Sequence, residues 1–254
     1  MIEKSKLLLI LFLPIVLSCT TINLQTKVNP PVKSYVKIYH KVSITKCTEA
    51  YRDKCPVGSY LSMGSGMVID LIKNQTIILT AGHVCKSEVD ETKILSHTQS
   101  ISVIDHKGFE HDAYVIKSTD DNGKGSIDAC ALWAPTIKEK GVKFSMFEPK
   151  VGQELYYIGS PSGIYHPPVA PILTGLYSGQ IDVSNSLVSI PATGGSSGSA
   201  VMDLNNRIVG ILWAAHEFHH VSIVTNWHAT SLFLYDIARM YNGKEKINLP
   251  LIRN

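Results

Sequence analysis

A histidine, an aspartate and a serine of this chain could together activate a nucleophile. They are His83, Asp128 and Ser197, in that order along the sequence. A serine hydroxyl becomes a strong nucleophile when an imidazole accepts its proton, and a carboxylate fixes the imidazole tautomer and stabilises its cation. The chemistry of this set would be hydrolysis of an acyl group through a covalent intermediate on the serine.

Glycines surround the candidate nucleophile in the segment Gly194-Gly195-Ser196-Ser197-Gly198. Such a loop can turn the backbone N–H groups of Gly195 and Ser197 toward one point, where they would form an oxyanion hole. Losing one donor of this kind typically slows acyl transfer by about 10²- to 10³-fold, so we expect the glycines to be functional. On residue type alone, Ser196 and Ser199 compete with Ser197 for the nucleophile role.

The three residues lie at the ends of short apolar runs, where loops display functional groups. Runs of this length that are rich in β-branched and aromatic residues predict strands. Examples are residues 66–70, 76–80, 154–158 and 207–213. We therefore predict a mostly β protein. A single amphipathic helix is predicted over residues 231–242, with Ser231 as its N-cap and Gly243 beyond its end.

Five segments resemble the trypsin/chymotrypsin-like serine proteases. The histidine segment reads Leu79-Thr80-Ala81-Gly82-His83-Val84, and the serine segment runs from Thr193 to Ser199. The others are residues 64–70, 157–163 and 174–179. The order His, Asp, Ser is also that of chymotrypsin. The resemblance is closest to HtrA-type and glutamyl endopeptidases.

This resemblance covers roughly residues 36–242 and implies an all-β fold of two six-stranded antiparallel β-barrels with a C-terminal helix. Within a protease domain over 35–243, barrel one would occupy about 35–135 and barrel two about 149–228. The resemblance implies a serine endopeptidase that cleaves polypeptides without a metal or organic cofactor. The Gly-x-Ser-Gly frame of the family selects Ser197. The alternative is a catalytically inactive relative that binds a peptide or an envelope partner.

The specificity pocket of this family lies beside the nucleophile, and here it would include Trp213 and Ala215. Glutamyl endopeptidases bind the substrate carboxylate through a threonine and a histidine, at positions that here hold Ala192 and Leu212. Neither side chain can hydrogen-bond, and burying an unpaired carboxylate costs several kcal/mol. We therefore expect cleavage after uncharged, small to medium apolar residues.

Two other functions are disfavoured by the sequence. Residues 216–220 match the HExxH zinc motif, which requires a helix to bring both histidines onto one face. Here the motif lies between two predicted strands, so we expect a polar hairpin loop and no catalytic metal. The formal charge is +3, from 24 Lys and Arg against 21 Asp and Glu, and the basic residues are scattered. This pattern does not predict nucleic-acid binding.

The first residues are typical of an export signal. Lys4 and Lys6 precede the apolar run 7–17, which is too short to span a bilayer of about 30 Å hydrocarbon thickness. Cys19 follows a small residue, which resembles a bacterial lipobox and implies a signal peptide over 1–18 and lipid on Cys19. The expected result is an extracytoplasmic lipoprotein, anchored to a membrane through this lipid. A polar tether over 19–34 and a tail over 244–254 would flank the protease domain.

Four cysteines remain after Cys19, an even number that favours two disulfides outside a reducing cytosol. They are Cys47, Cys55, Cys85 and Cys130. The sequence by itself permits three pairings. If the triad forms, Cys85 and Cys130 approach each other because each lies two residues after a triad member, and Cys47 would then pair with Cys55.

Overall fold

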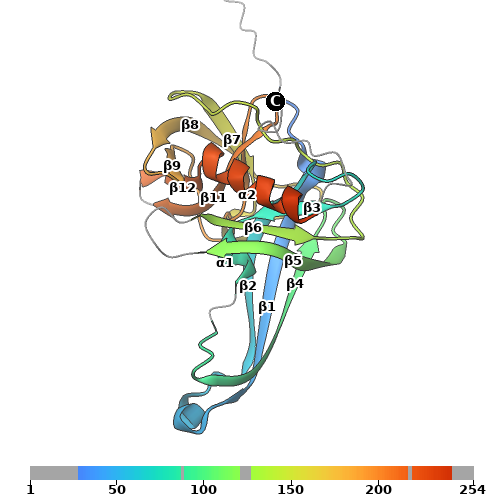
Figure 1. The fold of residues 1–254 in the computed structure, drawn as a ribbon, viewed down its shortest axis with the longest axis vertical. Helices are drawn as coiled ribbons and strands as arrows, with labels where there is room; N and C mark the ends of the chain where they lie inside the picture. Colours follow the sequence, from blue (N-terminus) through green and yellow to red (C-terminus); the bar gives the residue numbers. More distant parts are fainter. Residues whose placement is uncertain (1–27, 87–88, 121–126, 217–218, 242–254) are drawn as a thin grey trace, which may run out of the picture.

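A computed structural model of the chain describes residues 28–86, 89–120, 127–216 and 219–241 (Figure 1). Six strands form a first closed barrel in the order β1-β2-β3-β6-β5-β4. Their bounds are β1 Tyr35–Cys47, β2 Gly58–Ile69, β3 Ile77–Thr80, β4 Ile94–Ile104, β5 Glu110–Asp120 and β6 Asp128–Trp133. All the pairings in this barrel are antiparallel.

The second closed barrel has the order β10-β11-β12-β9-β8-β7 and is also antiparallel. Its strands are β7 Glu154–Ile158, β8 Ile172–Gln180, β9 Asn185–Val188, β10 Ala200–Asp203, β11 Ile208–His216 and β12 Val221–Thr225. The predicted fold class, two six-stranded antiparallel barrels, is confirmed.

Apolar packing joins the two barrels. β3 and the first five residues of β6 are buried, because the barrel-one interior covers one face of this sheet and barrel two with the C-terminal helix covers the other. One core cluster includes Ile78 and Leu132 of barrel one together with Ile211 of barrel two and Phe233 of the helix. A separate cluster fills the interior of barrel two. The barrels therefore present a rigid junction to the loops between them.

The C-terminal helix α2 spans Trp227–Met240, so the predicted start at residue 231 is wrong. Its N-cap is Asn226, whose Oδ1 accepts the Ala229 N–H at 2.8 Å. Ser231 instead lies inside the helix, where its hydroxyl donates to the His228 carbonyl. An Asn cap satisfies an otherwise free N–H of the first turn, which allows the helix to begin immediately after β12. The predicted end at residue 242 lies outside the described residues.

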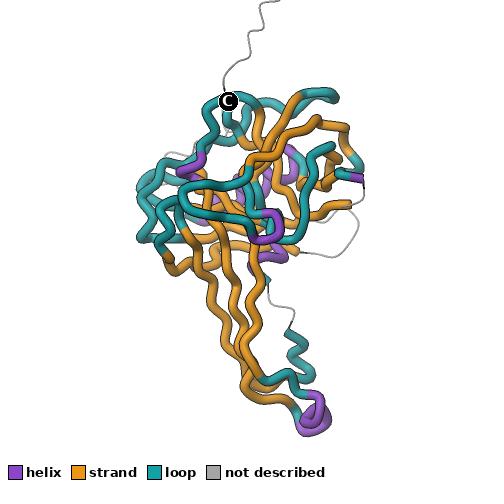
Figure 2. Tube along the Cα trace, turned by 180° about the vertical axis from the view of Figure 1, so that it is seen from behind, coloured by secondary structure: helices purple, strands orange, loops and turns teal. Residues whose placement is uncertain are grey.

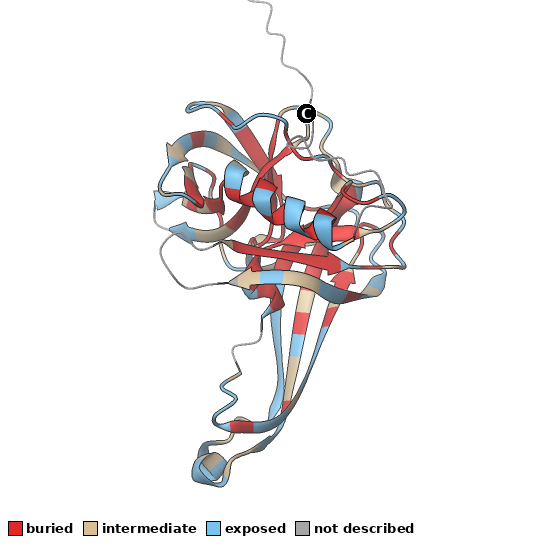
Figure 3. Ribbon diagram, in the orientation of Figure 1, coloured by how far each residue is buried: buried red, intermediate tan, exposed pale blue. Residues whose placement is uncertain are grey.

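Three strands continue well beyond barrel one and form an arm (Figure 1; Figure 2). We define the arm as residues 39–47 of β1, 58–63 of β2 and 94–100 of β4, with the 3₁₀ helix η2 Glu49–Lys54 at its tip. A Cys47–Cys55 disulfide closes the tip. Most of the arm is exposed to solvent (Figure 3). The sequence analysis did not anticipate this projection.

No helix within the described ranges is long and apolar enough to cross a membrane. The predicted signal peptide, Cys19, most of the tether and the tail lie outside the described residues.

Candidate active site

His83 and Asp128 meet where β3 and β6 lie side by side. The register pairs Thr80 with Cys130, so the short helix α1 Gly82–Cys85 that follows β3 lies beside the start of β6. His83 Nδ1 is 2.7 Å from Asp128 Oδ2, and the His83 backbone N–H donates to Asp128 Oδ1 at 3.1 Å. The carboxylate is largely buried, whereas the imidazole is 39% exposed. This contact can hold the imidazole in one tautomer.

A glycine permits this close approach. A Cβ on Gly82 would lie 2.0 Å from the Thr119 carbonyl oxygen and 3.0 Å from Asp128 Oδ1, so a larger residue would displace β5 or the carboxylate. A Cys85–Cys130 disulfide also ties α1 to β6. The structure therefore confirms both predicted pairings, Cys85–Cys130 and Cys47–Cys55.

Ser197 lies in a loop that both barrels hold in place. Its carbonyl accepts the Ser65 N–H of β2 at 2.8 Å, and the Gly198 N–H donates to the Leu212 carbonyl of β11 at 2.7 Å. Gly198 has φ of 86°, and a Cβ there would lie 2.0 Å from Thr80 Oγ1. Within the described part of the chain, Ser197 Oγ makes no hydrogen bond, so no bond joins it to His83. Such bonds are often long in a free enzyme and tighten when substrate binds.

Ser197 is the most accessible of the three candidate serines. Ser196 and Ser199 are fully buried, whereas Ser197 is half-buried. Ser196 Oγ is 3.2 Å from the Tyr157 hydroxyl, which donates to the Pro191 carbonyl. The structure therefore leaves Ser197 as the one hydroxyl of the set that a substrate can reach.

Among the residues that the structure describes, the backbone of the loop leaves two N–H groups without an acceptor, as an oxyanion hole requires. The Ser196 N–H donates to the Thr193 carbonyl at 3.0 Å, and Gly195 has φ of 90°, which is the signature of a type II turn. The Gly194 carbonyl accepts the Ser162 N–H at 2.7 Å. Because a trans peptide directs its C=O and N–H to opposite sides, the Gly195 N–H points away from Ser162. In the described residues, the N–H groups of Gly195 and Ser197 have no protein acceptor.

Buried hydroxyls hold this turn, and the sequence analysis missed them. Ser65 Oγ donates to the Gly195 carbonyl at 2.8 Å, and Ser160 Oγ donates to the same oxygen at 3.2 Å. The Ser160 N–H donates back to Ser65 Oγ at 3.0 Å, and the Tyr35 hydroxyl lies 3.3 Å from it. Burial raises the pKa of Tyr35 to about 12, so this hydroxyl stays neutral. Ser65 belongs to one of the segments that resemble proteases, but the resemblance gave it no role.

The four predicted pocket residues differ in their exposure. Ala192 and Leu212 are buried in the core cluster of barrel two, Trp213 is half-buried and Ala215 is exposed. The Trp213 indole N–H donates to Asn185 Oδ1 at 3.1 Å, which fixes the orientation of the ring. Of the four residues, Trp213 and Ala215 of β11 are therefore the ones that present apolar surface to a substrate.

The HExxH residues lie at a strand hairpin. His216 ends β11, and its ring centroid lies 4.5 Å from that of His219, just before β12. Residues 217 and 218 lie outside the described ranges. Within those ranges, no group of three or more His, Cys, Asp or Glu side chains could hold a metal ion.

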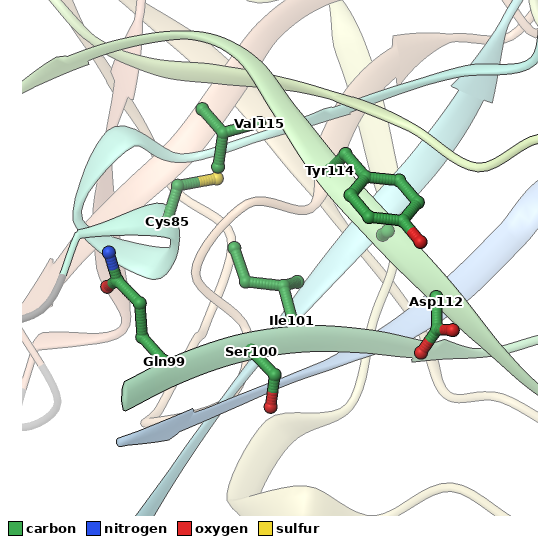
Figure 4. Close-up of a pocket in the computed structure, with 8 residues that line it drawn as sticks. Cys85, Gln99, Ser100, Ile101, Asp112, Tyr114 and Val115 are labelled. Atoms are coloured by element: carbon green, nitrogen blue, oxygen red, sulfur yellow. The ribbon is translucent and has the colours of Figure 1, made fainter. Parts of the chain in front are cut away.

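A cavity of about 490 Å³ opens on barrel one, where β4 separates from β5 to enter the arm (Figure 4). It is lined by Cys85, residues 99–101 of β4 and residues 112–115 of β5. His83, Asp128 and Ser197 do not line it, so we do not place the candidate active site there.

The two closed barrels, with His83, Asp128 and Ser197 at their junction, have the architecture of a trypsin-like peptidase domain. The sequence profile of the trypsin-like peptidase domain matches residues 64–211, which is more than half of the chain. The chain therefore belongs to this family. No curated protein matches the chain in a sequence comparison.

Solved structures agree at the level of the fold. A serine endoprotease from Yersinia pestis superposes with a TM-score of 0.60 at 16% identity, over 84% of this chain and 65% of that chain. The Rv3671c protease from M. tuberculosis, in its active form, gives a TM-score of 0.60 at 18% identity, over 84% and 86% of the two chains. Its inactive form gives 0.56 at 17% identity, over 82% and 90%. The predicted closeness to glutamyl endopeptidases stays a prediction.

Proposed function

We propose that the protein is a serine endopeptidase that hydrolyses polypeptides through an acyl-enzyme on Ser197. The observation that carries this proposal is the 2.7 Å contact between His83 Nδ1 and the largely buried Asp128 carboxylate, beside a loop with two free N–H donors. His83 takes the Ser197 proton as the hydroxyl attacks the scissile carbonyl, and Gly195 and Ser197 N–H groups stabilise the oxyanion. His83 then protonates the leaving amine. In the second step His83 takes a proton from water, the water attacks the acyl-enzyme, and His83 returns the proton to Ser197 as the acyl group leaves.

Labelling by a fluorophosphonate tests this proposal directly, since only an activated serine reacts fast. The full chain should label and cleave peptides, and Ser197→Ala and His83→Ala should each abolish turnover. Because the triad acts as a unit, the double variant should be scarcely worse than either single one. Ser196→Ala and Ser199→Ala should weaken the activity without abolishing it. A Ser197→Ala protein with wild-type turnover would overturn the mechanism, and absence of labelling in the wild type would favour a non-enzymatic binding role.

The proposed specificity is for small to medium apolar residues before the scissile bond. The accessible side chains of Trp213 and Ala215 are apolar, and Ala192 and Leu212, which are buried in the core cluster of barrel two, add no group that could pair with a charged substrate. Ser196 replaces the aspartate that an N-terminal ammonium activates in trypsins, so activation by N-terminal insertion is not expected. Cleavage profiling of a peptide library decides the matter, and dominant cutting after Glu, Lys or Arg would contradict it.

The proposed location is outside the cytoplasm, with lipid on Cys19 as the anchor. The two disulfides support an oxidising compartment, because such bonds are rare in a reducing cytosol. Cys19→Ser should release the protein from the membrane fraction. If fractionation does not change, the apolar segment 7–17 would be the anchor instead.

A further inference from the structure

The arm leaves one strand edge unpaired beside the candidate nucleophile. Within the described residues, 58–66 of β2 pairs with β1 on one side, and β3 pairs with β2 only at residues 67–69. The other edge of β2 therefore has no strand neighbour from Gly58 to Gly66, and Gly58–Met63 are all exposed. Such an edge presents N–H and C=O groups that an added strand can bind.

Ser65 shows which backbone groups face this edge. Its N–H donates to the Ser197 carbonyl and its C=O accepts from Thr80 Oγ1, both at 2.8 Å, so both groups point away from β1. In antiparallel pairing, outward-pointing groups recur at every second residue. Met63, Leu61 and Ser59 therefore present their N–H and C=O groups at the same edge. This row begins beside Ser197 and runs into the arm.

The edge lacks the usual protection against pairing. Exposed edges are generally blocked by charged residues, proline or bulges, and the stretch Gly58–Met63 contains no charge and no proline. Leu61 is 61% exposed and Met63 40% exposed. The Cys47–Cys55 disulfide holds the hairpin closed at its tip. The arm thus holds an uncharged, partly apolar edge open to solvent.

The chemistry at His83 indicates which part of a substrate meets the edge. His83 must protonate the leaving amine, so the residues after the scissile bond lie on the His83 side of the serine. α1 packs on β2 at Gly64, where a Cβ would lie 2.7 Å from a Val84 methyl. On the other side, the loop bonds to Leu212 of β11. The leaving segment therefore passes Gly64 and continues along β2.

We infer that Ser59, Leu61 and Met63 form an extended binding site for the polypeptide segment after the scissile bond, which adds to β2 as a further strand. The inference rests on the proposed endopeptidase function and specifies its substrate class. The substrate is an extended polypeptide with about six residues beyond the cut, matching about 20 Å of strand. Main-chain hydrogen bonds supply the affinity, and apolar side chains at alternate positions pack on Leu61 and Met63.

Substrates of two lengths test the inference. Internally quenched peptides with two or eight residues after the scissile bond are compared with an ester of the same acyl part. The ester has no residue after the scissile bond. In the wild type, kcat/KM should be about 10- to 100-fold higher for the long peptide, as several added hydrogen bonds allow. Leu61→Pro removes one outward N–H and keeps the β1 pairing, since proline is tolerated where the N–H faces solvent. It should abolish the length advantage and leave the ester rate and fluorophosphonate labelling unchanged.

His97→Pro is the matched control, because His97 lies on β4 at the opposite edge of the arm and faces Ile44 of β1. It should keep the length advantage. A second measurement leaves the enzyme intact and N-methylates the long peptide at alternate residues beyond the cut. One alternating set should lose the advantage and the other should retain it, so this series decides the question if Leu61→Pro fails to fold.

Three results would overturn the inference. The first is a wild type without a length effect. The second is that the Leu61→Pro variant keeps the higher kcat/KM for the long peptide, or that both N-methylated peptide series keep it. The third is that the wild type forms an oligomer, that Leu61→Pro dissociates it, and that kcat/KM still depends on peptide length. The edge would then bind a second copy of the chain. Failure of the proposed function is distinct, because then neither the ester nor the fluorophosphonate would react.

Discussion

Removing the Ser65 hydroxyl should separate catalysis from substrate binding. Ser65 Oγ donates to the Gly195 carbonyl and accepts the Ser160 N–H, and it is fully buried. In Ser65→Ala the Ser160 N–H loses its partner, and the Gly195 carbonyl keeps only the 3.2 Å bond from Ser160 Oγ. A buried polar group left unpaired costs about 1–3 kcal/mol. We therefore expect a loss of about 2–4 kcal/mol in the free energy of unfolding.

The catalytic effect follows from the turn that Ser65 supports. Complete loss of an oxyanion donor costs about 10²- to 10³-fold in rate. The Ser162 N–H still holds the Gly194 carbonyl in Ser65→Ala, so a partial loss of about 10- to 100-fold in kcat is expected. KM should change little, because the donor acts on charge that develops in the transition state.

Steady-state kinetics on a peptide substrate, with urea unfolding in parallel, checks both effects. Ser43→Ala is the control, because its hydroxyl bonds only to that of Ser59 on the exposed arm, at 2.8 Å. It should change stability by less than about 0.5 kcal/mol and leave kcat intact. A destabilised Ser65→Ala protein with wild-type kcat would refute the reasoning, because the turn at Gly195 would then keep its conformation without the Ser65 hydrogen bond.

Three further predictions concern stability. Replacing Cys85 and Cys130 together by Ala should cost about 4 kcal/mol for a separation of 45 residues, and replacing Cys47 and Cys55 about 2.5 kcal/mol for a separation of 8; equal losses in denaturant unfolding would contradict the chain-entropy account. Gly198→Ala should lower the free energy of unfolding by at least about 1–3 kcal/mol because of its positive φ and the 2.0 Å approach to Thr80 Oγ1. Gly194→Ala, where a Cβ meets nothing within 4 Å, should be nearly neutral, and similar melting temperatures for the two variants would argue against this packing. Burial lowers the pKa of His40 from 6.5, so the unfolded state binds the proton more readily and stability should fall as the pH drops below 6.5. His40→Phe should reduce this slope in unfolding free energies measured between pH 5 and 7.5, and an unchanged slope would assign it to other groups.

The sequence predicted the features that depend on local pattern. Short apolar runs predicted the strands, and the protease-like segments predicted the two barrels. His83 and Asp128 were predicted as partners because an activated serine needs an imidazole and a carboxylate, and because both residues lie at the ends of short apolar runs. The Cys85–Cys130 pairing followed from the same arrangement.

Other features depend on contacts between distant segments. The length of β1 beyond the barrel depends on pairing with Gly58–Met63, a segment that contains Ser and Gly and has little strand signal. Ser65 and Ser160 are ordinary serines in the sequence, and their role arises only when β2 and the segment after β7 meet. Helix α2 begins early because Asn226 caps it, although residues 227–230 lack a helical apolar pattern.

The nucleophile loop belongs to barrel two, but barrel one also holds it in position. Ser65 and Thr80 of barrel one surround Ser197 and Gly198, and Thr225 of barrel two donates to the Asp128 carbonyl at 3.0 Å. A chain whose second barrel has not yet docked would have neither a fixed nucleophile nor an oriented oxyanion hole. The proposed activity would therefore require both barrels to be folded and docked, and neither barrel by itself would carry it.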